Sequence, residues 1–277
     1  MPDSNGRRAA HLLVDVHVHF HPGYDPAAFF RAAHVNFAAA ATSFAITAWR
    51  GVLCFTESAG AHYFRSFREA GAVAGGAWRF EPTAEDISVV AHGPGGEQLV
   101  VVAGRQMVTR EGLEVLALGT AAELPDGLQL EEAVHLCLSQ DVVPVVPWGF
   151  GKWWFARGLQ LAALLRSSVG PQVFLGDNGG RLRFASAPRH FALARALKRP
   201  ILRGSDPLPF PDEVVRPGRY GVVLEGPVDL TRPGASLKAL LRGLATQPPA
   251  FGQRVGLAAF TRAQIVMQWQ KRTRSRA

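Results

Sequence analysis

The sequence predicts an α/β fold in which parallel strands alternate with helices, as an open doubly wound sheet or as a barrel. Two observations lead to this prediction. Apolar, β-branched runs recur along the 277 residues, with helix-like stretches between them. The composition, with 48% hydrophobic and 19% charged residues, is that of a compact globular protein with a sizeable core rather than of a disordered chain.

The elements follow from these runs in order. Strands are expected at 12–16, 51–55, 99–103, 113–118, 142–147, 173–175, 200–202 and 220–224. Helices are expected at 26–41, 61–70, 130–139, 158–167, 189–197, 235–245 and 261–272. The alternation is interrupted near 78–96, where the turn residues Gly93 to Gly96 predict a β-hairpin insertion. No linker rich in proline, glycine and serine divides the chain, so we expect one domain over 10–270 followed by a basic tail, 271–277.

Charge and cysteine content limit the function classes. The net charge is +8, of which the tail contributes +4 and the first ten residues +1, which leaves +3 for the body. This distribution disfavours nucleic acid as a partner. No apolar run is long enough to span a bilayer, so no membrane role is expected. Cys54 and Cys137 lie in apolar segments and suggest buried thiols rather than a disulfide framework, which favours a cytoplasmic protein.

The first expected strand ends in two histidines, His17 and His19. Residues two apart on a strand point to the same face, so these imidazoles should project together and form half of a divalent-metal site. Asp15 is expected on the same face, where it could orient a histidine or act as a further ligand. The alternative is a buried strand whose histidines are satisfied by backbone carbonyls.

Polar or glycine-rich groups follow several of the other strands, where α/β proteins build their sites. Glu57 follows the second strand, and Gln106 the third. Later strands lead to three further groups, at Trp148 to Lys152, at Asp177 to Arg181, and at Gly204 to Pro207.

The order and content of these motifs resemble the PHP family, the metal-dependent phosphoesterase domain shared by bacterial DNA polymerases and histidinol phosphatases. The matching segments are Asp15 to His19, which has the family's Asp-x-His-x-His pattern, Thr56-Glu57, and Gly204-Ser205-Asp206. The resemblance implies a distorted, TIM-like (β/α)7 barrel. It also implies that Asp25 and Asp206 are metal ligands together with the two histidines.

The sequence departs from the family pattern at several ligand positions. Ser58, Gln106, Trp148 and Leu208 stand where the family places ligands. We therefore expect a reduced site that holds one divalent ion (Zn, Mn or Fe) through His17, His19, Asp25 and Asp206, as in mononuclear amidohydrolases. Asp206 would also accept a proton from the metal-activated water, with Glu57 and Asp177 as supplementary catalytic acids.

The side chains that replace the family ligands suggest substrate binding. Lys152, Arg157 and Arg181 could bind a phosphate or carboxylate, with Trp148 as a stacking wall. Gln106 and Asn178 could donate hydrogen bonds to the same ligand. The alternative is that Trp148 only fills the rim of the barrel and that the basic side chains lie over it.

Two functions fit these features. The first is a metal-dependent hydrolase, a PHP-like phosphoesterase or an amidohydrolase, that acts on a small anionic substrate. The second is a non-catalytic descendant of the same barrel that binds an anionic small molecule or a protein partner. The sequence leaves the substrate and the oligomeric state open.

Overall fold

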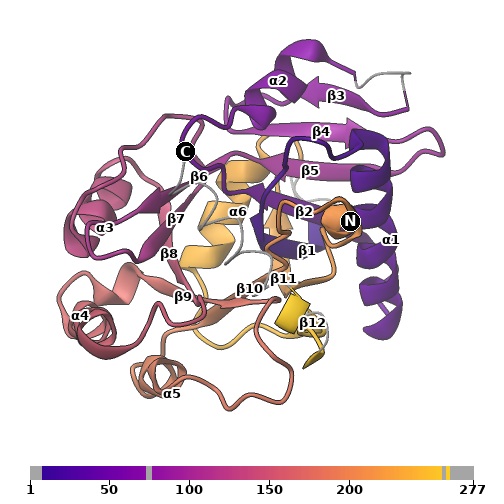
Figure 1. Ribbon diagram of the computed structural model, residues 1–277. Helices are drawn as coiled ribbons and strands as arrows, with labels where there is room; N and C mark the ends of the chain where they lie inside the picture. Colours follow the sequence, from indigo (N-terminus) through magenta and orange to yellow (C-terminus); the bar gives the residue numbers. More distant parts are fainter. Residues whose placement is uncertain (1–7, 73–76, 258–259, 263–277) are drawn as a thin grey trace, which may run out of the picture.

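The computed structural model describes residues 8–72, 77–257 and 260–262, which form two β-sheets with helices around them (Figure 1). The first sheet has seven strands in the order β12-β11-β1-β2-β5-β4-β3. Their bounds are Ala250–Gly252, Tyr220–Val228, Arg8–Val18, Trp49–Phe55, Gln98–Val102, Ser88–His92 and Arg79–Pro82. The second sheet has five strands in the order β10-β9-β8-β7-β6. Their bounds are Ile201–Gly204, Phe174–Asn178, Val143–Pro147, Glu114–Leu118 and Gly104–Val108.

The helices lie close to the positions that the sequence indicates. They are α1 Pro26–Ser43, α2 Tyr63–Ala70, α3 Leu130–Ser139, α4 Phe155–Arg166, α5 Arg189–Ala196 and α6 Pro233–Arg242. There are also two 3₁₀ turns, η2 at Gly170–Gln172 and η3 at Pro211–Val215. The helix expected at 261–272 lies almost entirely outside the described residues, as does the tail 271–277. The single domain over 10–270 stays a prediction.

Helix α1 shows how local sequence sets an element. The Asp25 carboxylate accepts hydrogen bonds from the backbone N–H groups of Ala27 (2.7 Å) and Ala28 (3.2 Å), which satisfies donors that a helix start leaves free. Pro26 occupies the first turn, where its missing N–H costs nothing. The apolar side chains of α1 then pack on the first sheet.

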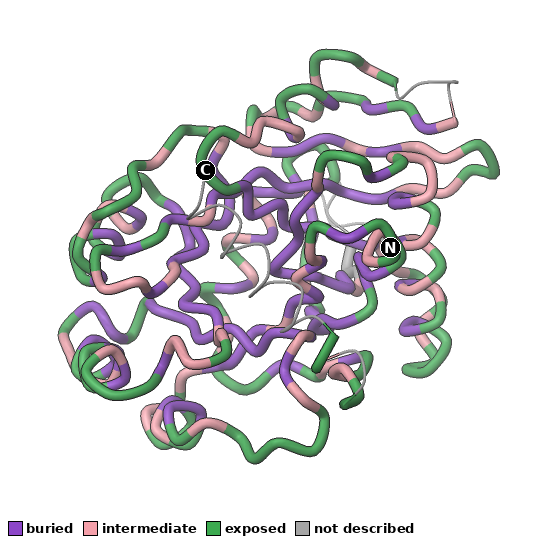
Figure 2. The backbone as a smooth tube through the Cα atoms, viewed as in Figure 1, coloured by how far each residue is buried: buried purple, intermediate pink, exposed green. Residues whose placement is uncertain are grey.

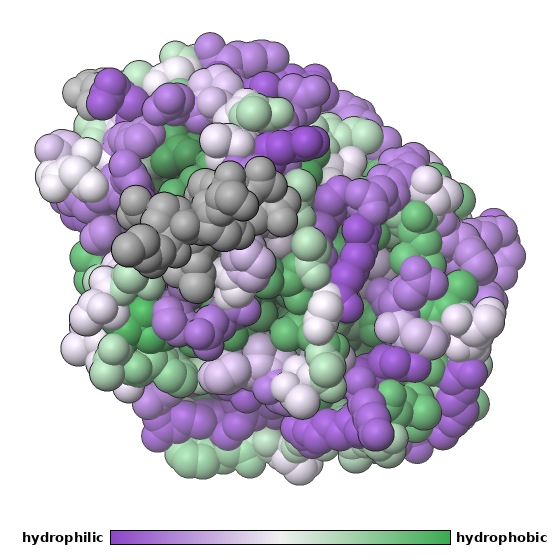
Figure 3. Space-filling view, turned by 180° about the vertical axis from the view of Figure 1, so that it is seen from behind, coloured by the Kyte–Doolittle hydropathy of each residue, from purple (hydrophilic) through white to green (hydrophobic). Residues whose placement is uncertain are grey.

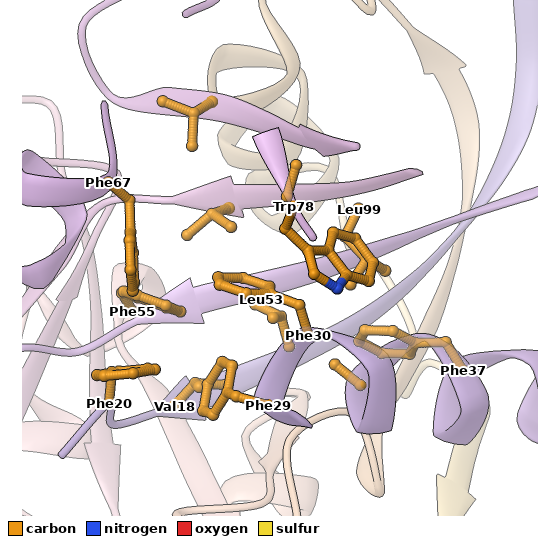
Figure 4. Close-up of a cluster of buried hydrophobic side chains, with 14 of the residues drawn as sticks. Val18, Phe20, Phe29, Phe30, Phe37, Leu53, Phe55, Phe67, Trp78 and Leu99 are labelled. Atoms are coloured by element: carbon orange, nitrogen blue, oxygen red, sulfur yellow. The ribbon is translucent and has the colours of Figure 1, made fainter. Parts of the chain in front are cut away.

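The outer core of the first sheet is aromatic, as Figure 4 shows for the side chains between α1, α2 and the strands. Phe67 and Phe80 stack with ring centroids 4.8 Å apart, and Phe30 packs edge-on against both Phe67 and Phe80. A second outer core joins α3, α4 and α5 to the second sheet, and a third fills the space between the sheets. The strands are accordingly the most buried part of the chain (Figure 2).

The predicted barrel is not confirmed, because no continuous ladder joins the two sheets in the described part of the chain. The sheets meet instead at two seams. Next to β2, the backbone N–H of Gln106 donates to the carbonyl of Glu57 at 2.9 Å. Next to β1, the N–H of Asp206 donates to the carbonyl of His17 at 2.8 Å. Both seams lie where β1, β2 and β10 end, and this is where the candidate site is built.

Outside the hairpin insertion, the expectation that the strands pair in parallel is only partly confirmed. β1, β2 and β5 pair in parallel, as do β8, β9 and β10, but β6, β7 and β8 pair antiparallel. Strand β6 was missed because Gly104-Arg105-Gln106 has the polar composition of a loop. The hairpin insertion is confirmed: β3 pairs antiparallel with β4, and the turn at 93–96 leads into β5 of the same sheet.

Within the described residues, no helix is long and apolar enough to cross a membrane. Figure 3 shows the rear face of the molecule as a mixture of hydrophilic side chains and smaller hydrophobic patches.

Candidate metal centre and its cleft

The two histidines of the first strand converge as their spacing predicts. The Nε2 atoms of His17 and His19 lie 3.0 Å apart, and both side chains are buried. Two neutral imidazoles whose Nε2 atoms face each other this closely need a proton or a cation between them, since their lone pairs otherwise repel. The paired histidines therefore form a real cluster and are not simply capped by backbone carbonyls.

Asp206 supplies the third group. Its Oδ1 lies 3.5 Å from His17 Nε2 and 3.6 Å from His19 Nε2. Around a tetrahedral ion with bonds of about 2.1 Å, neighbouring ligand atoms lie about 3.4 Å apart. The three distances of 3.0, 3.5 and 3.6 Å bracket that value. The donor set of two imidazole nitrogens and one carboxylate oxygen fits a divalent metal, and these three residues could hold one.

The backbone places Asp206 by close packing and a strained conformation. A Cβ atom on Gly204 would lie 2.4 Å from His17 Cβ, so only glycine lets β10 approach β1 this closely. Two residues later Asp206 has φ +48°, a left-handed conformation that non-glycine residues rarely adopt. Strain of this kind persists where surrounding structure enforces it, and it is common at functional sites.

Neighbouring groups fix the protonation states that metal binding requires. Burial, together with the nearby His17, lowers the pKa of His19 to about 3, so its imidazole is neutral at physiological pH. Burial alone would raise the pKa of Asp206, but His17 and His19 outweigh it and hold this pKa below its usual value. Asn178 adds to this effect because its Nδ2 donates to Asp206 Oδ2.

A polar chain leads from the histidines across the cleft. Gln106 Oε1 lies 3.2 Å from His17 Nε2, and Gln106 Nε2 donates to Glu114 Oε1 at 3.5 Å. Lys152 forms an ion pair with the same Glu114 oxygen. Gln106, Lys152 and Glu114 therefore all line the same cleft as the two histidines.

The cleft has a volume of about 310 Å³ and contains four of the six predicted substrate-binding residues: Gln106, Trp148, Lys152 and Asn178. The other two lie elsewhere. Arg157 donates to the backbone carbonyl of Gly151 at 2.9 Å and does not line the cleft. Arg181 is buried in an ion pair with Asp177. Ser58 and Leu208, which replace family ligands, also line the cleft.

The predicted catalytic role of Asp177 is not supported by its position. Both of its carboxylate oxygens accept hydrogen bonds from Arg181, at 2.7 and 2.9 Å, and Tyr220 Oη donates to it at 2.8 Å. Adjacent residues of a strand face opposite sides, so Asn178 points into the cleft and Asp177 away from it. Their turn-like composition, Asp-Asn-Gly-Gly, hid this difference from the sequence, because the strand extends through both residues.

Glu57 and Asp25 are likewise outside the cluster. Glu57 Oε1 accepts from the Phe64 N–H at the start of α2 (2.8 Å), and its Oε2 lies 3.4 Å from Arg105. Asp25 caps α1, so the structure does not bring this expected ligand to the histidines. A carboxylate shortly before a helix is as typical of an N-cap as of a ligand.

Asp15 is not a ligand in this arrangement. Its carboxylate accepts from the backbone N–H groups of Ser205 (2.8 Å) and Gly218 (2.9 Å) and from the Ser205 hydroxyl (2.5 Å). Burial raises its pKa to about 6. The pairing of β1 with β2 is irregular between Asp15 and Val18. The structure thus uses Asp15 to fasten β1 to the connection after β10.

Sequence reasoning missed Glu114 and Arg216 as residues of the cleft. Glu114 begins an otherwise apolar strand, a position where a charge is a signal of function. Arg216 lines the cleft and pairs with Glu213 at 3.0 Å. Phe150 is half-exposed in the cleft wall, and its ring lies 5.3 Å from that of Trp154.

Comparisons with known proteins agree with this fold. No family model and no curated protein sequence matches the chain. The crystal structure of PsfC from Pseudomonas syringae PB-5123 superposes with a TM-score of 0.59 at 16% identity, over 94% of this chain and 99% of that one. The lesion-specific endonuclease PfuEndoQ from Pyrococcus furiosus superposes with a TM-score of 0.51 at 12% identity, over 86% of this chain. The match covers 57% of that endonuclease, so this chain corresponds to just over half of it.

The endonuclease likeness corrects one expectation. A small anionic substrate, with nucleic acid disfavoured, was predicted from net charge, but the fold is shared with an enzyme that acts on nucleic acid. Net charge was a poor guide because it averages over the surface, whereas binding depends on where the charges gather. At 16% and 12% identity, both likenesses concern the fold alone: the chain shares its α/β fold with these two structures.

Proposed function

We propose that the protein is a metal-dependent phosphoesterase that cleaves phosphodiester bonds in nucleic acid. The observation that carries this proposal is that His17 and His19 from β1 meet Asp206 from the segment after β10 in the lining of one cleft. A buried cluster with this donor set fits a divalent cation such as Zn, Mn or Fe. The chain's likeness to an endonuclease favours nucleic acid as the substrate.

His17, His19 and Asp206 would hold the cation, with Gln106 as the nearest further oxygen. When bound, such a cation polarises a phosphoryl oxygen and makes water more acidic. The role of Asn178 is to hold the Asp206 carboxylate in place through its Nδ2 donor.

The other side chains of the cleft suit a phosphodiester. Lys152 and Arg216 place positive charge in the cleft, each beside one carboxylate, Glu114 or Glu213. They would orient the anionic group rather than neutralise it fully. Trp148 and Phe150 offer aromatic surfaces on which bases can stack. The rim thus combines the two features that single-stranded nucleic acid needs.

Metal content and cleavage test this proposal together. Protein purified without chelator should contain stoichiometric metal, and a His17→Ala/His19→Ala variant should not. End-labelled single-stranded and duplex oligonucleotides, incubated with each cation, should be cut by the wild type and not by the variant. Asp25→Asn is the matched control, since this residue caps α1 and should retain both metal and cleavage.

A metal-free protein whose thermal stability is unchanged by chelator would contradict the proposal and favour a non-catalytic barrel. A metal-loaded protein that cuts no oligonucleotide would contradict the nucleic-acid substrate and leave only metal binding.

A further inference from the structure

A second cavity, of about 380 Å³, lies beside the metal-site cleft. Five arginines and one carboxylate give it its charge, and we call it the basic pocket: Asp177, Arg181, Arg183, Arg195, Arg203 and Arg254. The two cavities share their walls. Asp177 and Arg254 line the basic pocket, whereas the next residues, Asn178 and Val255, line the cleft.

The positive charge of the basic pocket is largely uncompensated. Asp177 forms its ion pair with Arg181, through two hydrogen bonds of 2.7 and 2.9 Å. In the described ranges, the remaining four arginines have no ion pair with a carboxylate: Arg183, Arg195, Arg203 and Arg254. Four guanidinium groups around one cavity repel each other, and a bound anion relieves that repulsion.

Three of these arginines are positioned by neutral partners. Arg203 lies over the ring of Tyr220, 5.3 Å from its centroid. Arg183 donates from Nη1 to Gln253 Oε1 at 2.7 Å, and Arg254 donates from Nη1 to the Leu182 carbonyl at 3.4 Å. A guanidinium has five N–H donors, so these contacts leave most of them free for a ligand.

We propose that the basic pocket is a second binding site, which takes a phosphate group. A planar guanidinium matches the oxygens of phosphate with two parallel hydrogen bonds, and several arginines can share one such group. The cavity is large enough for a phosphate with part of an attached molecule. Because the site contains none of the metal-binding residues, it does not depend on the proposed hydrolase activity.

The phosphate group can belong to a nucleic-acid strand or to a free phosphorylated molecule. The wall between the two cavities distinguishes these two ligands. Val255 N–H donates to the Gly179 carbonyl at 3.0 Å, so the strap at 252–255 lies against the loop after β9 and separates the cavities. A nucleic-acid strand that crosses this strap would place one phosphate in the cleft and another in the basic pocket. A free phosphorylated molecule would occupy the basic pocket alone.

Calorimetric titration of the metal-free full-length protein with pyrophosphate tests the site. Removing the metal prevents pyrophosphate from binding to a cation in the cleft. Binding should weaken about tenfold or more in an Arg183→Gln/Arg195→Gln variant, because both lost groups are charged donors. Arg31→Gln/Arg110→Gln removes the same charge from exposed positions outside both cavities and should leave the affinity unchanged.

Competition identifies the source. If a short single-stranded oligonucleotide displaces pyrophosphate, and its own affinity falls in the pocket variant, the phosphate belongs to nucleic acid. If pyrophosphate binding depends on the pocket but the oligonucleotide does not compete, the ligand is a free phosphorylated molecule.

Absence of pyrophosphate binding, or equal weakening in the control variant, would overturn the proposal. Metal content is measured in parallel, so that a failure of the phosphate-site proposal can be told apart from a failure of the proposed hydrolase function. Both arginine variants should keep wild-type metal stoichiometry.

Discussion

The Asp206 Oδ1 atom lies 3.5 Å from His17 Nε2, although one residue belongs to the first strand and the other follows the tenth. This contact exists because β10 ends beside β1, where Gly204 removes the Cβ that would otherwise collide with His17. The proposed metal binding depends on that juxtaposition, and the predictions below test it and the elements around it.

Asn178 should act as a positioning residue for the metal. Asn178→Ala removes the amide donor to Asp206, so the carboxylate is no longer held, and metal affinity should fall about 10- to 100-fold. Titration with Zn²⁺ against a competing chromophoric chelator measures this. Ser58→Ala, also in the cleft, is the control and should bind as the wild type does. A metal affinity of Asn178→Ala equal to that of the wild type would show that Asp206 does not need this hydrogen bond to bind metal.

Gly204→Ala should destabilise the protein and weaken metal binding together. The added methyl would lie 2.4 Å from His17 Cβ and 2.5 Å from its backbone N, so β1 and β10 must separate. Overpacking of this kind costs about 1–3 kcal/mol. Urea unfolding and metal titration check the two effects. Gly23→Ala has open space around its Cβ and serves as a control for steric contact, although its positive φ of 86° adds backbone strain. Wild-type metal affinity in Gly204→Ala would contradict the geometric argument.

Arg181 should stabilise the fold rather than bind substrate in the cleft. Arg181→Met leaves the buried Asp177 carboxylate with Tyr220 as its remaining hydrogen-bond partner, which should cost about 3–5 kcal/mol of unfolding free energy. The double variant Asp177→Asn/Arg181→Met removes both charges and should recover part of this loss. Chemical denaturation measures both. A stable Arg181→Met protein would argue for a functional role instead.

Asp25→Ala should cost about 1 kcal/mol through loss of the α1 N-cap and leave metal content unchanged. Asp25→Asn keeps a capping oxygen and should be close to wild type in stability. Thermal unfolding and metal analysis distinguish the N-cap role of Asp25 from a role as metal ligand. Loss of metal in both variants would show that Asp25 is a ligand.

Stability should depend on pH through His190. Burial lowers the pKa of this imidazole from its ordinary value of 6.5, and its Nε2 lies 2.8 Å from the Gly158 carbonyl. The folded state thus favours neutral His190, and its contribution is complete above pH 6.5 and declines as the pH falls below that value. Urea unfolding between pH 8 and pH 5 should show a shallower loss in His190→Gln than in the wild type. Parallel slopes would contradict this assignment.

The sequence alone determined the features that depend on local pattern. The period of two on a strand brings His17 and His19 together, and the helices lie close to the apolar periodicities that predicted them. The turn at 93–96 marked a real hairpin. Each of these is a consequence of backbone geometry over a few residues.

Only the tertiary structure decided which distant groups meet. Strand order and the close approach at Gly204 bring Asp206 to the histidines. The facing of β9 sends Asn178 into the cleft and Asp177 to a buried ion pair. The sequence Asp-Asn-Gly-Gly does not show which of two adjacent side chains points into the cleft. Composition also gives the sum of the charges but not their positions. The arginines of the basic pocket come together only through the packing of α5, β10, the loop after β9 and the segment after β12.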